Sequence, residues 1–192
     1  MKLVLTTFVI TLLLSCQPTS TPSPGGDLAG YTLESIPGSD FERAYKIEGK
    51  RIVEEGQVWN GKKNGTWVTY HNNPRNFPKV VITYVDGKRS GPYMEFNPFG
   101  QFLMVAHYQD DQLNGRMAKY DFTRIKEEIH YKDGEMDGLY TLYYDNSDQV
   151  QRTAEFKDGK ENGWIRYYNE EGKLTMEYEY RNGEKISGGI VD

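Results

Sequence analysis

Residues able to do acid–base or metal chemistry are few in this sequence. Its 192 residues include three histidines, His71, His107 and His130, and one cysteine, Cys16. His107 and His130 occupy the same place in successive copies of a repeat, so they could approach a shared metal ion or pair with a carboxylate. No third ligand and no nucleophile accompanies them in that pattern. We therefore expect two solvated histidines, with no metal and no cofactor.

Acidic residues show no catalytic pattern either. Asp145-Asn146-Ser147-Asp148 begins like a calcium loop, but Val150 and Phe156 stand where that loop needs Gly and Glu. Adjacent acids on a strand point to opposite faces, which separates the members of an acidic pair. The pairs of adjacent acids include Asp110-Asp111, Glu127-Glu128 and Glu170-Glu171. We expect no catalytic residues and a protein that is not an enzyme.

The single cysteine follows an N-terminal apolar stretch. Met1-Lys2 precedes an apolar run, residues 3–14, which is shorter than the roughly 20 residues of a transmembrane helix. A charged start and a short apolar core are typical of a secretory signal peptide, residues 1–15. Leu13-Leu14-Ser15-Cys16 resembles the bacterial lipobox, which implies that Cys16 carries acyl chains and attaches the protein to a membrane of the cell envelope. An ordinary signal peptide with an incidental cysteine is the alternative.

A spacer and one folded domain make up the rest of the chain. Residues 16–44 contain Cys16 and a run of Pro, Ser, Thr and Gly with almost no side chain to bury, so we predict a lipidated tether there. Residues 45–192 are predicted to form the domain. The net charge of −5 argues against nucleic acid as a partner, and a single cysteine excludes a disulfide scaffold.

A repeated spacing of glycine and aromatic residues organises the predicted domain. Each copy contains an anchor three residues before a turn position: Val58, Tyr84, Tyr108, Tyr131, Phe156 and Tyr180. Glycines recur three and seven residues after the anchors, and these predicted turn glycines are Gly61, Gly65, Gly87, Gly91, Gly115, Gly134, Gly138, Gly159, Gly163 and Gly183. Asp111 and Ser187 replace glycine in this pattern.

The turn glycines predict β-hairpins. Most of them follow Asn or Asp, and Asn-Gly and Asp-Gly are the strongest short-range hairpin signal because they tolerate positive φ. The runs between them are rich in Tyr, Val, Ile, Thr and Phe, which suit strands. We predict an all-β fold, an elongated antiparallel meander of hairpins with about two strands per 24-residue repeat. Residues 45–56 are a degenerate first half-repeat with a turn at Gly49-Lys50.

An aromatic column lies twelve residues after the anchors. Its members are Tyr70, Phe96, Tyr120, Tyr143 and Tyr168. The rings could stack between hairpins and supply the core of a thin sheet. They could also form an exposed strip that binds a glycan, a peptide or another protein. Both interpretations hold together if adjacent tyrosines serve opposite faces of a strand.

The repeats carry a family resemblance. Residues 131–140, Tyr-Lys-Asp-Gly-Glu-Met-Asp-Gly-Leu-Tyr, and residues 156–164, Phe-Lys-Asp-Gly-Lys-Glu-Asn-Gly-Trp, resemble MORN-type repeats. They are more similar to the bacterial MORN-variant, antitoxin-like family, over roughly residues 45–190. The resemblance implies a repeat sheet that serves as an interaction or membrane-associated module.

These observations lead to three functional expectations. The first is a lipid-anchored, non-catalytic module of the bacterial cell envelope that binds another envelope protein. The second, which the resemblance alone implies, is an antitoxin-like or immunity-like protein that neutralises a partner toxin. The third, an envelope glycan hydrolase with acidic residues on the sheet, is the least favoured.

Overall fold

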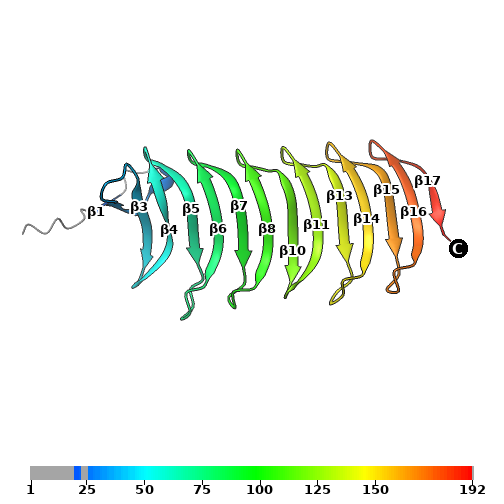
Figure 1. Cartoon of the computed structure of the whole chain (residues 1–192), viewed down its shortest axis with the longest axis horizontal. Helices are drawn as coiled ribbons and strands as arrows, with labels where there is room; N and C mark the ends of the chain where they lie inside the picture. The colour runs from blue at the N-terminus through cyan, green and yellow to red at the C-terminus, as the bar shows by residue number, and fades with distance from the viewer. Residues whose placement is uncertain (1–19, 23–25, 192) are drawn as a thin grey trace, which may run out of the picture.

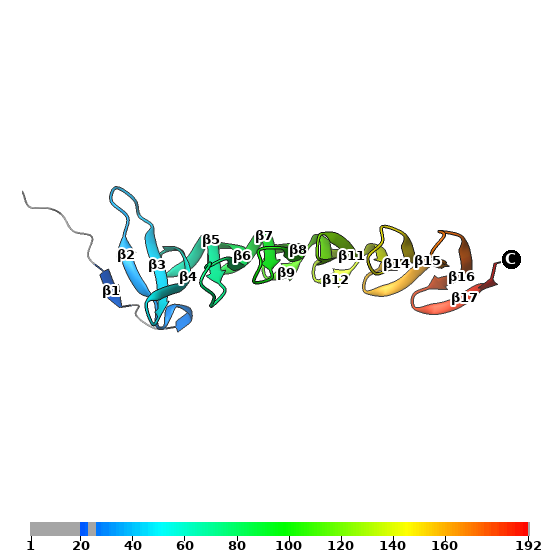
Figure 2. The ribbon, with the colours of Figure 1, turned by 90° about the horizontal axis from the view of Figure 1, so that it is seen from below.

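The protein is a row of antiparallel hairpins placed side by side along one long axis (Figure 1). The computed structural model describes residues 20–22 and 26–191, and the predicted signal peptide and Cys16 lie outside the described residues. The described part contains no α-helix, and its one helical element is a 3₁₀ turn at Gly26–Leu28 (η1). Figure 2 shows that no second layer of elements covers the sheet along most of its length. The all-β meander predicted from the repeats is confirmed.

Each main strand pairs with the next one along the chain. The N-terminal strands are β1 (Ser20–Pro22), β2 (Thr32–Ser35), β3 (Glu42–Glu48), β4 (Arg51–Trp59) and β5 (Lys62–Tyr70). The central strands are β6 (Pro78–Val85), β7 (Lys88–Phe96), β8 (Phe102–Gln109), β10 (Gly115–Asp121) and β11 (Arg124–Lys132). The C-terminal strands are β13 (Gly138–Tyr143), β14 (Val150–Lys157), β15 (Lys160–Tyr168), β16 (Leu174–Arg181) and β17 (Glu184–Ile190). The short strand β9 (Gln112–Leu113) pairs with β8 directly before β10, which pairs with the same strand. In the same way, the short strand β12 (Glu135–Met136) pairs with β11 directly before β13.

The two long edges of the sheet carry different connections. Tight two-residue turns lie along the upper edge in Figure 1, and mostly wider loops lie along the lower edge. In the tight turn between β6 and β7, φ is 51° at Asp86 and 85° at Gly87. Positive φ at both central residues defines a type I′ turn, whose twist matches that of paired strands. Asp111 adopts φ of 71° where the pattern would have glycine.

The second glycine of each repeat is not in a turn, which corrects the sequence prediction. These glycines lie inside strands or begin them: Gly65, Gly91, Gly115, Gly138 and Gly163. Ile82 pairs with Tyr93 but Tyr84 pairs with Arg89, so one residue of β6 faces three of β7, with Gly91 in the middle. The glycine therefore forms a β-bulge. Positive φ, here 126°, serves a bulge as well as a turn, and the sequence alone does not separate the two uses.

The tips of the tight turns are tied to the preceding hairpin. The N–H of Gly87 donates to the carbonyl of Lys63 at 2.9 Å. The same bond recurs from Asp111 to Arg89, Gly134 to Leu113, Gly159 to Met136 and Gly183 to Glu161. We call these five hydrogen bonds the tip ladder. They join neighbouring hairpins beyond the point where regular strand pairing ends, which for β5 and β6 is the pair Gly65 and Tyr84.

Buried apolar side chains gather mainly on one face, which we call the core face. Ile82 pairs with Trp67 on one side and Tyr93 on the other, and directly opposite residues share a face. One buried cluster contains Leu28, Tyr31, Leu33, Ala44, Val58, Trp67 and Ile82. A second contains Ala106, Met117 and Ile129. Each cluster spans neighbouring hairpins, as expected for a repeat that cannot bury its apolar side chains alone.

The sheet begins earlier than the predicted domain boundary at residue 45. Residues 26–44, which the sequence analysis assigned to the tether, contain η1, β2 and the start of β3. Leu28, Leu33 and Ala44 are buried there against Val58 and Trp67. The first complete hairpin needs a neighbour to cover these side chains, and β2 and β3 supply it. The predicted turn at Gly49-Lys50 joins β3 to β4.

We predict that Gly163→Ala lowers the free energy of unfolding by about 1–3 kcal/mol. Gly163 has φ of 127°, and a Cβ there would lie 2.8 Å from the Cβ of Glu155. The matched control is Gly189→Ala in β17, where φ is ordinary and no atom lies within 4 Å of the added Cβ. Urea unfolding should leave the control unchanged or slightly more stable. Equal midpoints for the two variants would contradict the bulge assignment.

Candidate binding surface

Cations lie over aromatic rings on the core face. The Lys63 ammonium lies 4.0 Å from the Trp67 ring centroid and 5.5 Å from that of Tyr84. The Arg89 guanidinium lies 4.5 Å from the Tyr108 centroid. Both cations lie five residues after an anchor. The sequence analysis did not identify this position of the repeat, although the spacing of the anchors was already known. The cations cover part of the core face, so the rings beneath them serve the packing of the protein itself.

Burial on the core face changes the acidity of its tyrosines. Burial, with neighbouring Glu95, raises the pKa of Tyr93 to about 12. Burial, with neighbouring Glu127, raises the pKa of Tyr140 to about 12. These hydroxyls stay protonated at any physiological pH, so they offer no general base.

The predicted aromatic column occupies the opposite face, which we call the ladder face. The Tyr70 hydroxyl donates to Glu55 Oε1 at 2.7 Å, and the Arg43 guanidinium donates to Glu55 Oε2 at 2.7 Å. Burial tends to raise the pKa of Glu55, but the bonds from Arg43 and Tyr70 outweigh it and lower that pKa. The Tyr143 hydroxyl donates to Glu128 Oε2 at 2.9 Å in the same way. The first and the fourth members of the column, Tyr70 and Tyr143, are therefore held by Tyr–Glu hydrogen bonds.

The middle of the column is a stack of rings. Phe96 and Phe102 have centroids 4.8 Å apart, and Phe102 and Tyr120 have centroids 5.8 Å apart. The backbone carbonyl of Tyr168 accepts a hydrogen bond from the Tyr144 hydroxyl at 2.7 Å. All five residues of the column are half-buried. The column therefore contributes to packing, and the most exposed aromatic rings lie elsewhere.

The most exposed aromatic rings lie at the lower edge of the sheet, next to this stack. Phe99, in the loop between β7 and β8, is 73% exposed, and Phe122, in the turn between β10 and β11, is 68% exposed. Phe102, the first residue of β8, is 41% exposed. We call Phe99, Phe102 and Phe122 the apolar loop edge. Exposed aromatic rings at one edge of the sheet are candidate contacts for a partner.

Backbone strain accompanies this exposure at one position. Phe122 has φ of 53°, in the left-handed region where a bulky side chain is an outlier. Asp121 and Arg124 pair across the turn, so only Phe122 and Thr123 connect the strands. Strain that is retained at an exposed ring is the basis of a functional hypothesis for this turn. The sequence analysis did not identify Phe99 or Phe122, because neither belongs to a repeat column.

The three histidines lie in separate surroundings, on different strands or loops of the sheet. His71 Nε2 lies 2.8 Å from the Phe96 carbonyl oxygen, and His130 Nδ1 lies 3.0 Å from the Leu139 carbonyl oxygen. His107 and His130 are exposed. In the described part of the chain, no group of three His, Cys, Asp or Glu side chains is placed to hold a metal ion.

Comparison with known proteins assigns no family to the chain. No protein-family model matches it, and no curated protein matches it. The resemblance to MORN-type repeats stays a prediction that rests on the residues quoted for it. No helix among the described residues is long and apolar enough to cross a membrane.

We predict that stability falls as the pH rises from 10 to about 12. The pKa of Tyr93 and of Tyr140 is raised in the folded protein, so folding holds both protons more tightly than the unfolded chain does. Their contribution to stability is complete below pH 10 and is lost as the pH rises through the folded pKa. Urea midpoints and the near-ultraviolet absorbance of tyrosinate should change together in this window. Tyr93→Phe with Tyr140→Phe should flatten the profile, and an equally steep profile would contradict the assignment.

Proposed function

We propose that this protein is a lipid-anchored, non-catalytic module of the bacterial cell envelope that binds another envelope protein. The observation that carries the proposal is the apolar loop edge, with Phe99 73% and Phe122 68% exposed beside a ring stack. Aromatic side chains are the anchors that dominate protein–protein interfaces when they enter a pocket of the partner. Burying both rings against a partner would remove apolar surface from water, and this favourable free energy is not available to either ring in the free protein.

The surroundings of the apolar loop edge support a preorganised binding surface. The Asn73 side-chain amide donates to the Pro98 carbonyl at 3.2 Å, which joins the loop between β5 and β6 to the loop that carries Phe99. Asn97 Oδ1 accepts the N–H groups of Phe99 and Gln101 at 2.9 and 3.0 Å. Loops held in this way lose little conformational entropy on binding, which favours affinity.

The lipid anchor of the proposal is Cys16, on the strength of the lipobox resemblance. Three residues, 17–19, separate Cys16 from β1, which pairs with β2. The four Cα–Cα steps from Cys16 to Ser20 span at most about 14 Å. An acylated Cys16 would therefore hold the N-terminal end of the sheet close to the membrane surface, with the apolar loop edge further along the array.

We predict that the double variant Phe99→Ser with Phe122→Asn no longer recovers the partner. Quantitative capture from solubilised envelopes with the tagged full chain should recover the partner at least tenfold less well, because both aromatic anchors are removed. Asn tolerates positive φ, so Phe122→Asn should raise the free energy of unfolding by about 1 kcal/mol.

Ile190→Ser is the matched control for the capture experiment. Ile190 is 81% exposed at the end of β17, far from the apolar loop edge. The control should recover the partner as the wild type does. Recovery of the same protein by the double variant and the wild type would contradict the proposed surface.

We predict that Cys16→Ser removes acylation and releases the protein from the membrane fraction. The thiol is the group that acyl chains would modify, and a serine hydroxyl does not replace it in that processing. Fractionation and metabolic lipid labelling measure both effects. A variant that stays in the membrane fraction and keeps its lipid label would contradict the lipid anchor.

A further inference from the structure

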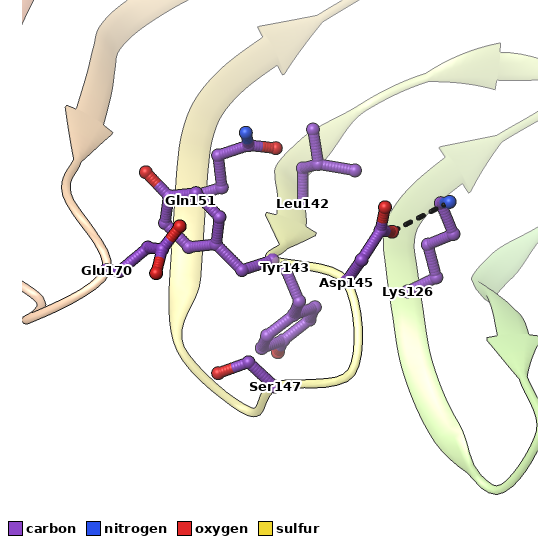
Figure 3. A pocket seen from close by; sticks show the side chains of 8 residues that line it. Lys126, Leu142, Tyr143, Asp145, Ser147, Gln151 and Glu170 are labelled. Atoms are coloured by element: carbon purple, nitrogen blue, oxygen red, sulfur yellow. Dashed lines mark hydrogen bonds and ion pairs between the residues drawn. The ribbon is translucent and has the colours of Figure 1, made fainter.

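A polar cavity lies at the lower edge of the sheet, in the C-terminal half and apart from the apolar loop edge. Its volume is about 500 Å³, and its lining includes Lys126, Tyr143, Asp145, Ser147, Gln151 and Glu170 (Figure 3). These residues come from β11, from the β13–β14 hairpin and from the loop between β15 and β16. The volume falls in the range of small-molecule sites, roughly 300–1,000 Å³.

Some polar groups of this cavity are satisfied and others are free. Lys126 Nζ pairs with Asp145 Oδ1 at 3.0 Å, as Figure 3 shows, and Ser147 Oγ accepts the N–H of Gln149 at 3.0 Å. Within the described residues, the side-chain amide of Gln151 and the carboxylate of Glu170 have no hydrogen-bond partner. Gln151 is half-buried and Glu170 is exposed, and both line the cavity. Two polar groups with open hydrogen-bonding capacity therefore face the same space.

The charges of the lining exclude several classes of ligand. A phosphate or another strong anion would meet the carboxylates of Asp145 and Glu170, and the cation of the lining, Lys126, is already paired with Asp145. A fully apolar ligand would leave the Gln151 amide without a partner. A neutral ligand that is rich in hydroxyl groups and has an apolar face would engage both free groups, the Gln151 amide and the Glu170 carboxylate.

We propose that this cavity binds a saccharide. A sugar ring has a face of C–H groups that can lie against the ring of Tyr143 or Tyr144, both of which line the cavity. Its hydroxyl groups both donate and accept hydrogen bonds. The Gln151 amide donates to and accepts from them, and the Glu170 carboxylate accepts from them. Neither Phe99 nor Phe122 lines this cavity, so the site is independent of the proposed protein-binding surface.

The experiment measures binding of two disaccharides, cellobiose and chitobiose, to the purified full chain by saturation-transfer NMR and titration. We expect saturable binding of at least one of them with a Kd of about 1 mM or below. Gln151→Ala and Glu170→Ala should each weaken the affinity about tenfold, the effect of losing one good hydrogen bond. Both side chains lack protein partners, so neither change should alter the urea midpoint.

Glu171→Ala is the matched control, because Glu171 is an exposed acid in the same loop that does not line the cavity. It should leave the affinity unchanged. Failure of both disaccharides to bind would overturn the proposal, as would binding that Gln151→Ala and Glu170→Ala leave unaltered. Binding of the polyamine spermidine that salt abolishes, without saccharide binding, would overturn it in favour of a cation site at Glu170.

Discussion

The hydrogen bond from each turn tip to the preceding hairpin is the interaction on which this open sheet depends. A sheet without a second layer holds each hairpin only through its neighbours, so the ends of the hairpins need a bond of their own. The tip ladder supplies it: the N–H of Gly87, for example, reaches the Lys63 carbonyl at 2.9 Å. The bulge makes this possible, because regular pairing between β5 and β6 ends at Gly65 and leaves that carbonyl free. The turn and the bulge therefore act together: the turn supplies the donor of each tip-ladder bond, and the bulge leaves its acceptor free.

The tip ladder also shapes the core face at two positions. Two of the residues whose carbonyls accept a tip place their cationic side chains over aromatic rings: Lys63 over Trp67, and Arg89 over Tyr108. These cations cover part of the core face, while the ladder face is packed by its own rings and by Tyr–Glu bonds. The lower edge carries loops that differ between repeats, and such loops are where binding residues are expected on a rigid scaffold. The exposed rings and the polar cavity both lie there.

The sequence was sufficient for the fold because turn chemistry and strand composition repeat in every copy. It was insufficient where one residue type has two uses: Gly61 closes a turn and Gly65 forms a bulge, although both follow Asn. The predicted start of the domain, residue 45, was wrong because Tyr31 and Leu33 follow closely after a Pro- and Ser-rich run and were assigned with it to the tether. Their burial depends on the neighbouring hairpin, which the local sequence does not show. Phe122 was missed because a sequence pattern does not report exposure or a positive φ at a bulky residue.

Amide hydrogen exchange at the turn glycines tests this account most directly. Gly87, Gly134, Gly159 and Gly183 donate in the tip ladder, whereas Gly61, in the first tight turn of the upper edge, makes no such bond among the described residues. All five glycines lie in the same type of turn. Without the tip-ladder bonds, their five amides should therefore exchange at similar rates. The account predicts that the four ladder amides are strongly protected and that of Gly61 is not. Exchange of all five at one rate would contradict it.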